Sequence, residues 1–321
     1  MAGKTELRIN FSGFWQGFNK TNNFFYHLLS KKYELLISDE PELLFFSESS
    51  TDHIKYSCTK VFYTGENIRP DFMLCDFAFS FDYPLTKRNY RLPLYALYDD
   101  VKKLVNRHVD ANIVLAGKKK FCCFIVSNDK CKIRNDFFFK LSEYKQVDAA
   151  GKLFNNIGGP IENKLEFIKD YKFVIAFEND SYPGYTTEKI FEPLQQNCIP
   201  IYWGDPLVSN DFNTRSFINC HEYPSFNDAI KRVIELDNND DLYMQYLHEP
   251  AFTGDKLTEF VKEENIVKRL DEIIAFQRGH HFNIRKTIRL AYFFLKTYFY
   301  KLNKKIQAKA TILNDNKKYS Q

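Results

Sequence analysis

Short apolar runs alternate along the chain with longer stretches whose apolar residues recur at helical spacing. The apolar runs predict strands at Leu7–Phe11, Tyr33–Ser38, Leu43–Ser47, Lys60–Tyr63, Phe77–Phe81, Phe121–Val126, Lys172–Phe177 and Ile199–Trp203. Helices are predicted at Asn22–Ser30 with Asn22 as its cap, and at Ile133–Tyr144, Thr187–Gln196, Ser225–Glu235, Asp240–His248, Lys256–Arg278 and much of Ile284–Ala310. Strands that alternate with helices in this way predict an α/β protein with parallel sheets and crossover helices.

The elements fall into two series, and the chain between them, Arg107–Lys119, is expected to hold a domain boundary. A chain of 321 residues is long enough for two cores. We therefore expect an N-terminal domain over residues 1–115, a second domain over 116–278 and a tail over 279–321. Two open α/β domains in series predict a ligand site in a cleft at the carboxyl ends of their strands.

Charge is uneven along the chain, whose formal net charge is +4. The stretch Gly279–Lys309 carries many lysines and arginines and no acid, and aromatic and aliphatic residues interleave with them. Such a basic amphipathic helix is typical of segments that lie on an anionic membrane surface. The alternative is a final helix that packs back on the domains. No apolar run is long enough to span a bilayer.

The seven cysteines are odd in number and show no CxxC spacing, which argues against a disulfide framework and against a zinc site. Reduced thiols are typical of the cytoplasm. The residues Met1–Glu6 also lack the basic and apolar pattern of a signal peptide. The expected location is therefore cytoplasmic, with the tail on the inner face of the membrane.

The most informative stretch joins the strand that ends at Phe177 to the helix that begins near Thr187. Its loop contains Pro183-Gly184, a turn signal that lets backbone approach a ligand. Lys189 in the first helical turn suggests a phosphate, because a helix N-terminus already favours anions. Glu188 suits the two hydroxyls of a ribose. The alternative is a capping box in which Glu188 only stabilises the turn. The residue pattern alone leaves both open.

This stretch resembles the signature of the α-1,3-fucosyltransferase family, which transfers L-fucose from GDP-fucose. The matching pieces are Phe177-Glu178-Asn179, Tyr185-Thr186-Thr187-Glu188-Lys189 and Pro200-Ile201-Tyr202-Trp203-Gly204-Asp205-Pro206. The resemblance extends from roughly Val61 to Tyr223 and is closest to Helicobacter-like bacterial members. It implies two Rossmann-like, doubly wound domains that face each other across a cleft, the GT-B type. It also implies that the GDP part of the donor is bound by Asn179, Tyr185, Glu188 and Lys189.

Two further pieces agree with this resemblance. Phe124–Asn128 followed by Ile133-Arg134-Asn135 resembles the start of the family's donor domain, where an arginine pairs with the diphosphate. Arg134 is the matching residue, and Ser127 and Asn128 are expected in the same donor site. In Val61–Asn67, Glu66 matches the family's general base, and Arg91-Leu92-Pro93 matches downstream. Without the resemblance, Arg134 would be taken for an exposed helix arginine and Glu66 for an exposed loop carboxylate.

The resemblance also implies a mechanism. GDP-fucose holds the sugar in a β linkage and the family product is α, so one displacement with inversion is needed. Glu66 would take the proton from the acceptor hydroxyl. Arg134 and Lys189 would stabilise the leaving GDP, so these three are the candidate catalytic residues. The chain has no convincing DxD motif, and we expect no metal and no other cofactor. Asp180–Pro183 depart from the family's Gly-rich loop, and the heptad repeats of some relatives are absent.

The acceptor is the least determined partner. The family supplies this site from the first domain, and the natural expectation is O3 of N-acetyllactosamine on lipopolysaccharide. Trp15 and Asn67 are the candidate acceptor residues, although Trp15 suits a core position equally well. No nucleic-acid partner is expected. The alternatives are an inverting transferase for another nucleotide sugar and an inactive glycan-binding relative.

Overall fold

The computed structural model describes residues 3–279 and 283–318. Its strands are β1 (Thr5–Ser12), β2 (Tyr33–Ile37), β3 (Leu43–Phe46), β4 (Thr59–Tyr63), β5 (Phe77–Ser80), β6 (Asn89–Arg91), β7 (Lys120–Phe124), β8 (Val147–Ala149), β9 (Tyr171–Phe177), β10 (Ile199–Trp203) and β11 (Ile218–Asn219). Its α-helices are α1 (Phe24–Ser30), α2 (Ala111–Gly117), α3 (Lys132–Tyr144), α4 (Lys164–Ile168), α5 (Glu188–Gln195), α6 (Phe226–Asp237), α7 (Asp240–His248), α8 (Glu263–Arg278) and α9 (Asn283–Lys318). Short 3-10 turns are η1 (Asp52–Lys55), η2 (Leu94–Leu97), η3 (Asp99–Leu104), η4 (Val208–Asn210), η5 (Cys220–Glu222) and η6 (Thr253–Asp255).

The strands form two sheets with the same kind of order. The first sheet has the order β2-β1-β3-β4-β5-β6, and the second β11-β10-β9-β7-β8. In the first sheet β1 pairs in parallel with both β2 and β3, so Ile9 lies between Ile37 and Leu43. In the second, β7 pairs in parallel with both β8 and β9. In each sheet the strand order therefore reverses beside the first strand of the series, which is where doubly wound folds bind ligands.

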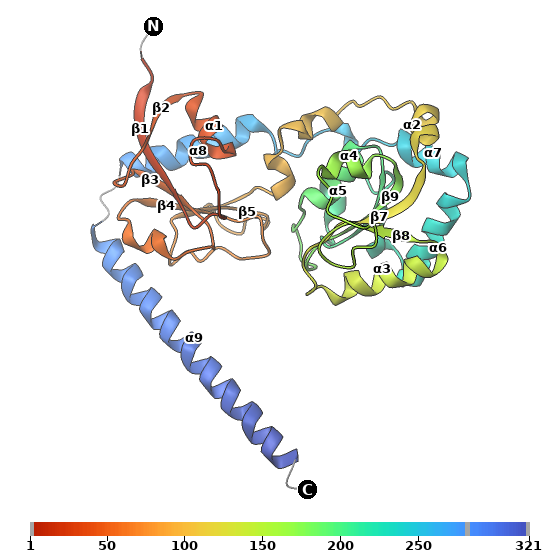
Figure 1. The fold of residues 1–321 in the computed structure, drawn as a ribbon. Coiled ribbons are helices and arrows are strands. Elements are labelled where there is room, and N and C mark those ends of the chain that lie inside the picture. Colours follow the sequence, from red (N-terminus) through yellow and green to blue (C-terminus); the bar gives the residue numbers. More distant parts are fainter. Residues whose placement is uncertain (1–2, 280–282, 319–321) are drawn as a thin grey trace. The chain divides into compact units, whose positions relative to one another are not determined.

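Alternation along the strands of the second sheet builds a core on each face, and helices α3 to α7 surround this sheet (Figure 1). Phe173 and Ile175 of β9 face the larger core, to which α3, α6 and α7 contribute. Val174 lies between them in sequence and faces a smaller core with Cys123 and Ile168. This alternation is the period of a β-strand, and it requires helices on both sides of the sheet. The expected doubly wound α/β class is confirmed.

The chain folds into two compact units that do not follow the sequence in one cut. The first unit comprises 1–63, 70–78 and 269–321, and the second comprises 64–69 and 79–268. The turn 64–69 and the segment 79–115 belong by packing to the second unit, and the buried ion pair between Arg91 and Asp211, 2.5 Å long, ties that segment there. The domain ranges 1–115, 116–278 and 279–321 that the sequence suggested stay a prediction.

Most predicted elements are present, and two details differ. Asn23, not Asn22, caps α1, because its side chain accepts from the N–H of Tyr26. The helix expected from Lys256 begins only at Glu263. The pattern Leu257, Phe260 and Val261 has helical spacing, but Phe260 packs on the ring of Tyr90 and its carbonyl accepts from the Tyr90 hydroxyl. A long-range contact therefore overrides a local helical pattern.

Helix α9 packs on the rest of the first unit through its first turns. Arg289 is buried and donates to Asp76 at 2.6 Å, while Tyr292 and Lys296 both contact Asp71. Farther along, the described aromatic side chains of Tyr298, Phe299 and Tyr300 are exposed. None of the helices in the described ranges is long and apolar enough to cross a membrane.

Candidate active site

A buried carboxylate at the end of β9 organises the start of α5. Glu178 is fully buried, and its Oε1 accepts from the N–H of Thr187 at 2.7 Å. The Thr187 hydroxyl and the Nζ of Lys189 also donate to this carboxylate, the latter at 3.0 Å. Burial lowers the pKa of Lys189, but the Glu178 and Glu188 carboxylates raise it more, so the ammonium stays charged. Glu178 was not singled out from the sequence, although it follows directly on a buried strand.

The same contacts test the interpretation of Glu188 as part of a capping box. Glu188 is the first residue of α5, after the N-cap Thr187. In a capping box an acid at the third helical position would accept from the N–H of the cap. Here that N–H goes to Glu178 instead. Glu188 is only partly buried and lies 3.8 Å from the Nζ of Lys189. The capping-box alternative is therefore wrong, and the ribose-binding role stays a prediction.

Arg134 lies where the strand order reverses, in α3 directly after β7. It is 1% exposed, so the interpretation as a surface arginine is wrong. Its Nη1 donates to Oδ1 of Asn179 at 2.8 Å, and its Nη2 donates to the carbonyl of Asn128 at 2.6 Å. Its Nε has no partner in the described structure. A guanidinium that is buried with a free donor suits an anion, and burial lowers its pKa from the usual arginine value. Ser127 lies in the exposed loop beside it.

The loop between β9 and α5 is held by the motif that follows β10. Asp205 is buried, and its carboxylate accepts from the N–H of Gly184 at 2.8 Å and from the Thr186 hydroxyl at 2.9 Å. Tyr185, between these two anchors, is buried with its ring edge on Phe81. Burial raises the pKa of Tyr185 far above the usual tyrosine value, and the nearby carboxylates of Glu178 and Glu66 raise it further. The phenol therefore stays protonated and can donate to a ligand.

Glu66 lies in the turn that leaves β4, and this turn packs with the second unit. The Glu66 side chain is exposed, and its backbone N–H donates to the Thr64 hydroxyl at 3.0 Å. The neighbouring Asn67 donates to Oδ2 of Asp180 at 2.6 Å. The turn that carries the candidate base thus contacts the candidate donor loop through Asn67. Asn67 was a candidate for acceptor binding, and that role stays untested.

Arg91 belongs to a motif that was expected near the site, and it forms a buried ion pair with Asp211. Its guanidinium is buried in a paired contact with Asp211 and lies over the ring of Tyr83 at 4.5 Å. Burial alone would lower the pKa of Arg91, but Asp211 and the nearby tyrosines raise it, so the guanidinium stays charged. Both terminal nitrogens of Arg91 are taken by one carboxylate, and its Nε has no partner in the described structure, so we interpret Arg91 as a scaffold for the segments that it joins.

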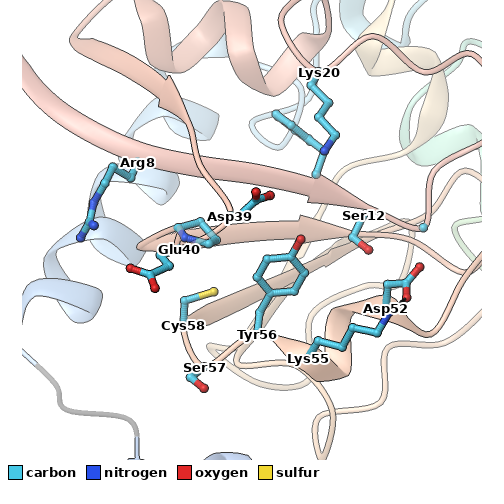
Figure 2. Close-up of a pocket in the computed structure, with 13 residues that line it drawn as sticks. Arg8, Ser12, Lys20, Asp39, Glu40, Asp52, Lys55, Tyr56, Ser57 and Cys58 are labelled. Carbon is cyan, nitrogen blue, oxygen red and sulfur yellow. Dashed lines mark hydrogen bonds and ion pairs between the residues drawn. The ribbon is translucent and has the colours of Figure 1, made fainter.

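The first unit carries a polar pocket of its own, shown in Figure 2. Its lining residues are Arg8, Phe11, Ser12, Gly13, Lys20, Asp39, Glu40, Pro41, Asp52, Lys55, Tyr56, Ser57 and Cys58, and its volume is about 930 Å³. Acids, bases, hydroxyls and the aromatic rings of Phe11 and Tyr56 all border it. Trp15 lies in the same loop as Gly13 and Lys20, and 63% of its surface is exposed. The core alternative for Trp15 is therefore wrong, and its acceptor role stays a prediction.

All seven cysteines are buried, and none of them forms a disulfide in this structure. Within residues 3–279 and 283–318, no group of three or more His, Cys, Asp or Glu residues is arranged to hold a metal ion. The pair His280-His281 lies outside the described residues.

Comparisons with known proteins bear on most of the chain. Residues 9–98 match the family model of the Alpha-(1,3)-fucosyltransferase FucT N-terminal domain, and residues 115–269 match Glycosyltransferase family 10 (fucosyltransferase) C-term. The Alpha-(1,3)-fucosyltransferase FucT of Helicobacter pylori is 32% identical over 295 residues, which cover 79% of this chain and 61% of that protein. The Putative fucosyltransferase R654 of Acanthamoeba polyphaga mimivirus is 32% identical, over 50% of this chain and 28% of its own length. The chain thus spans less than two thirds of these relatives.

Solved structures give the same result for the fold. A crystal structure of an alpha1,3-fucosyltransferase with GDP-fucose superposes with a TM-score of 0.73 at 28% identity, covering 85% of this chain and 91% of that one. A crystal structure of an alpha1,3-fucosyltransferase described without a ligand superposes with a TM-score of 0.75.

Proposed function

The chain belongs to the glycosyltransferase family 10 of fucosyltransferases, and from that membership we propose that it transfers L-fucose from GDP-fucose to a glycan hydroxyl. The relatives that carry this activity are longer than the part the chain matches, so the activity is tested below on this chain itself.

The observation that supports the proposal most is the placement of Arg134. A buried guanidinium with an unpartnered Nε lies at the reversal point of the second sheet, bonded to Asn179 of the family signature. Lys189 belongs to the same signature and lies in the first turn of α5, a helix of eight residues whose N-terminal N–H groups also favour an anion. Two fixed cations suit a diphosphate, and the partly buried Glu188 beside them suits a ribose.

The proposed reaction is a single displacement that inverts the anomeric carbon. Glu66 accepts the proton of the acceptor hydroxyl as the new glycosidic bond forms, and GDP leaves with the electrons of the bond that breaks. Arg134 and Lys189 stabilise the charge that grows on the β-phosphate, a contribution of about 3 kcal/mol for each well-aimed donor. These two cations take the place that a divalent metal fills in other glycosyltransferases, so no metal is required.

We place the acceptor on the first unit. Trp15 presents an exposed aromatic face, and the polar pocket reached by the same loop offers hydroxyl, carboxylate and amino groups. Aromatic faces pack on the apolar side of a sugar ring, and polar groups of both kinds bind its hydroxyls. The proposed acceptor is O3 of N-acetyllactosamine, as part of lipopolysaccharide.

We further propose that the end of α9 rests on an anionic membrane surface on the cytoplasmic side. The part beyond Lys296 exposes Tyr298, Phe299 and Tyr300, with Lys301 and Lys304 also exposed. Aromatic side chains next to lysines suit the headgroup region of an anionic leaflet. The first turns of α9 instead contact Asp71 and Asp76, so the packed alternative describes those turns and the membrane proposal concerns only the later stretch of the helix.

The test measures GDP release from GDP-fucose in EDTA, with and without N-acetyllactosamine, for the wild type and Glu66→Gln. We expect release that depends on the acceptor and falls by at least about a hundredfold in the variant. Glu162→Gln, which changes an exposed loop carboxylate elsewhere in the second unit, is the matched control. Loss of activity on chelation would overturn the metal-independent mechanism.

Thermal shifts with GDP and UDP separate the remaining alternatives. A shift with GDP and none with UDP is expected. A preference for UDP would indicate another nucleotide sugar, and a response to neither nucleotide would contradict a donor site. Binding of GDP without transfer to any glycan would indicate an inactive relative.

A further inference from the structure

Arg69 occupies an unusual position three residues after the candidate base. Its guanidinium contacts two aromatic rings, 4.1 Å from the centroid of Phe81 and 3.7 Å from that of Tyr182. It also makes two hydrogen bonds, because Nη1 donates to Asp82 and Nη2 donates to Oδ1 of Asn67. A cation that contacts two rings and donates to two separate acceptors uses the wide, multiply donating guanidinium, which lysine lacks.

These contacts continue into the donor loop. Asn67 receives a hydrogen bond from Arg69 on its oxygen and donates from its nitrogen to Asp180, at 2.6 Å. Tyr182, which covers Arg69, lies in the same loop as Asp180. We call the five residues Asn67, Arg69, Phe81, Asp180 and Tyr182 the clasp. All five lie in the second unit.

The loop side of the clasp is fixed to the sheet. Ser181 donates from its hydroxyl to the carbonyl of Gly204 at 2.7 Å, and Gly184 donates to Asp205. Gly184 has a φ of +88°, and a Cβ there would lie 2.3 Å from the carbonyl oxygen of Phe81. The loop therefore lies directly on the segment that also stacks on Arg69.

The other side of the clasp is the turn that carries Glu66. Its backbone is held before Glu66 by the Thr64 hydroxyl and after it by a hydrogen bond from the N–H of Ile68 to the carbonyl of Glu66, at 2.7 Å. The Glu66 side chain itself is exposed. The Glu66 backbone is thus held by its near neighbours, and the next part of the turn is held by the side chains of Asn67 and Arg69.

From this arrangement we propose that Arg69 is a positioning residue that holds the turn of Glu66 at a fixed place against the donor loop. The proposal rests on the proposed function, because it gives Glu66 the role of general base. Asp180 and Tyr182 both contact the turn through their side chains, so these contacts link the turn of Glu66 to the donor loop.

The expected effect follows from the geometry of proton transfer. A general base must lie within hydrogen-bond reach of the hydroxyl that it deprotonates, and a misplacement of about 1 Å costs about a hundredfold in rate. Loosening the turn should therefore lower kcat. The GDP-binding residues Arg134 and Lys189 have their own anchors in Asn128, Asn179 and Glu178, so donor affinity should change little.

The experiment compares Arg69→Met, Arg69→Lys and Tyr182→Ala with the wild type by steady-state kinetics and GDP thermal shift. We expect kcat to fall by about tenfold or more, with the KM for GDP-fucose and the GDP shift within about twofold of wild type. Tyr182→Phe keeps the ring and should restore most of the rate lost in Tyr182→Ala. Arg232→Met is the matched control, because Arg232 stacks on Tyr246 and pairs with Glu235 away from this site.

A double variant distinguishes positioning from general damage. If Arg69 acts through Glu66, Arg69→Met should lower kcat in the wild-type background and cause no further loss in Glu66→Gln. An equal loss in both backgrounds, or a loss of GDP binding that matches the loss of rate, would overturn the proposal. If Arg69→Met fails to fold, Asn67→Ala and Asp180→Ala take its place in the same cycle.

The outcomes also separate this proposal from the proposed function. If Glu66→Gln has wild-type activity, the base assignment fails and the clasp fails with it. If Glu66→Gln is inactive and the clasp variants are as active as the wild type, only the clasp is wrong.

Discussion

At the scale of single residues, Lys189 and Glu178 are useful because each constrains the other. The lysine supplies a cation for the proposed diphosphate, and the fully buried carboxylate holds it there at 3.0 Å. A buried charge that loses its partner destabilises a protein by about 3–5 kcal/mol. The pair therefore couples donor binding to stability.

Lys189→Met should weaken GDP binding by at least about tenfold, because a charged hydrogen bond to phosphate is lost. It should also make stability more dependent on pH. Burial raises the pKa of Glu178 above the usual glutamate value, and Lys189 counteracts that rise. Without the lysine, the Glu178 carboxyl favours the protonated form more strongly. Its contribution to stability is then present at low pH and is lost as the pH rises through its folded pKa.

Urea unfolding at about pH 5.5 and about pH 8 measures this effect. The double variant Lys189→Met with Glu178→Gln is the control, because it removes the uncompensated charge. It should recover stability at the higher pH and leave GDP binding weak. A single variant with the pH profile of the wild type would contradict the coupling.

His53 is a second residue with a measurable consequence, in the first unit. Its ring stacks on Phe46 at 4.1 Å and is buried, and neither ring nitrogen has a partner in the described structure. Burial lowers its pKa to about 4, and the charges of Lys60 and Arg289 add to the effect, while Asp52 opposes it. The folded state therefore prefers neutral His53. Its contribution to stability is complete above the usual histidine pKa and is lost as the pH falls towards 4.

Between about pH 7.5 and about pH 5, His53 should cost the fold about 2 kcal/mol of unfolding free energy. His53→Phe keeps the stacked ring and removes the titration, so its loss over this range should be smaller by that amount. Urea unfolding of both proteins at the two pH values checks this. Parallel pH profiles would show that His53 does not titrate in this range.

At the scale of elements, the loop between β9 and α5 has a geometric requirement at Gly184. Its φ of +88° favours glycine, and the carbonyl oxygen of Phe81 would lie 2.3 Å from an added Cβ. Gly184→Ala should therefore push the loop off Phe81, and the KM for GDP-fucose should rise by about tenfold or more because Tyr185 follows directly.

Gly158→Ala is a matched control for this change. Gly158 has the same φ of +88°, but no atom lies within 4 Å of its added Cβ. Both variants carry the cost of backbone strain, and only Gly184→Ala carries the clash. Equal kinetic parameters in the two variants would show that the close approach to Phe81 has no part in donor binding.

An element could be predicted from the sequence when the residues that determine it lie close together in the chain. The longer strands β1 to β5, β7, β9 and β10 follow from nearby residues, and the sequence predicted them, whereas the short strands β6, β8 and β11 were not predicted. The shift of the α1 cap from Asn22 to Asn23 is one residue within a pair of identical side chains. The coil before α8 was missed because its cause is Tyr90, far away in the sequence. A one-dimensional pattern contains no such contact.

The candidate site shows the same limit. The signature led to Arg134, Glu188 and Lys189, and the structure places their neighbours around them. Glu178 and Asp205 were missed as site residues, although both lie inside the motifs, because their role is to accept hydrogen bonds from backbone several residues away. The clasp could not be predicted, since Arg69 and Tyr182 are separated by more than a hundred positions.

At the scale of the whole molecule, α9 is one helix with two kinds of surroundings. Removal of the whole helix would separate Asp76 from Arg289, a buried pair whose loss should cost about 3 kcal/mol. A chain that ends at Lys296 keeps the anchored turns and lacks the exposed aromatic part. We expect this shorter chain to keep the stability of the full chain and its activity on a soluble acceptor, but to lose binding to anionic vesicles.

Co-sedimentation with anionic and neutral vesicles checks this expectation. Binding of the full chain should weaken with added salt, because exposed charges are screened. The pair Lys301→Glu with Lys304→Glu should weaken binding without shortening the helix. Unchanged sedimentation of the shorter chain would contradict the membrane role.

The burial of every cysteine has a practical consequence. Burial raises the pKa of Cys58 to about 12 and raises those of Cys122 and Cys123 far above the usual thiol value, so little thiolate forms at neutral pH. Maleimide reagents should therefore label the folded protein very slowly, without any need to replace the native thiols first. A single cysteine introduced at Tyr300 would then take a fluorophore at one known place, and its emission would follow lipid contact directly. In the unlabelled protein, the rate at which the native thiols react would measure how often the fold opens and exposes them.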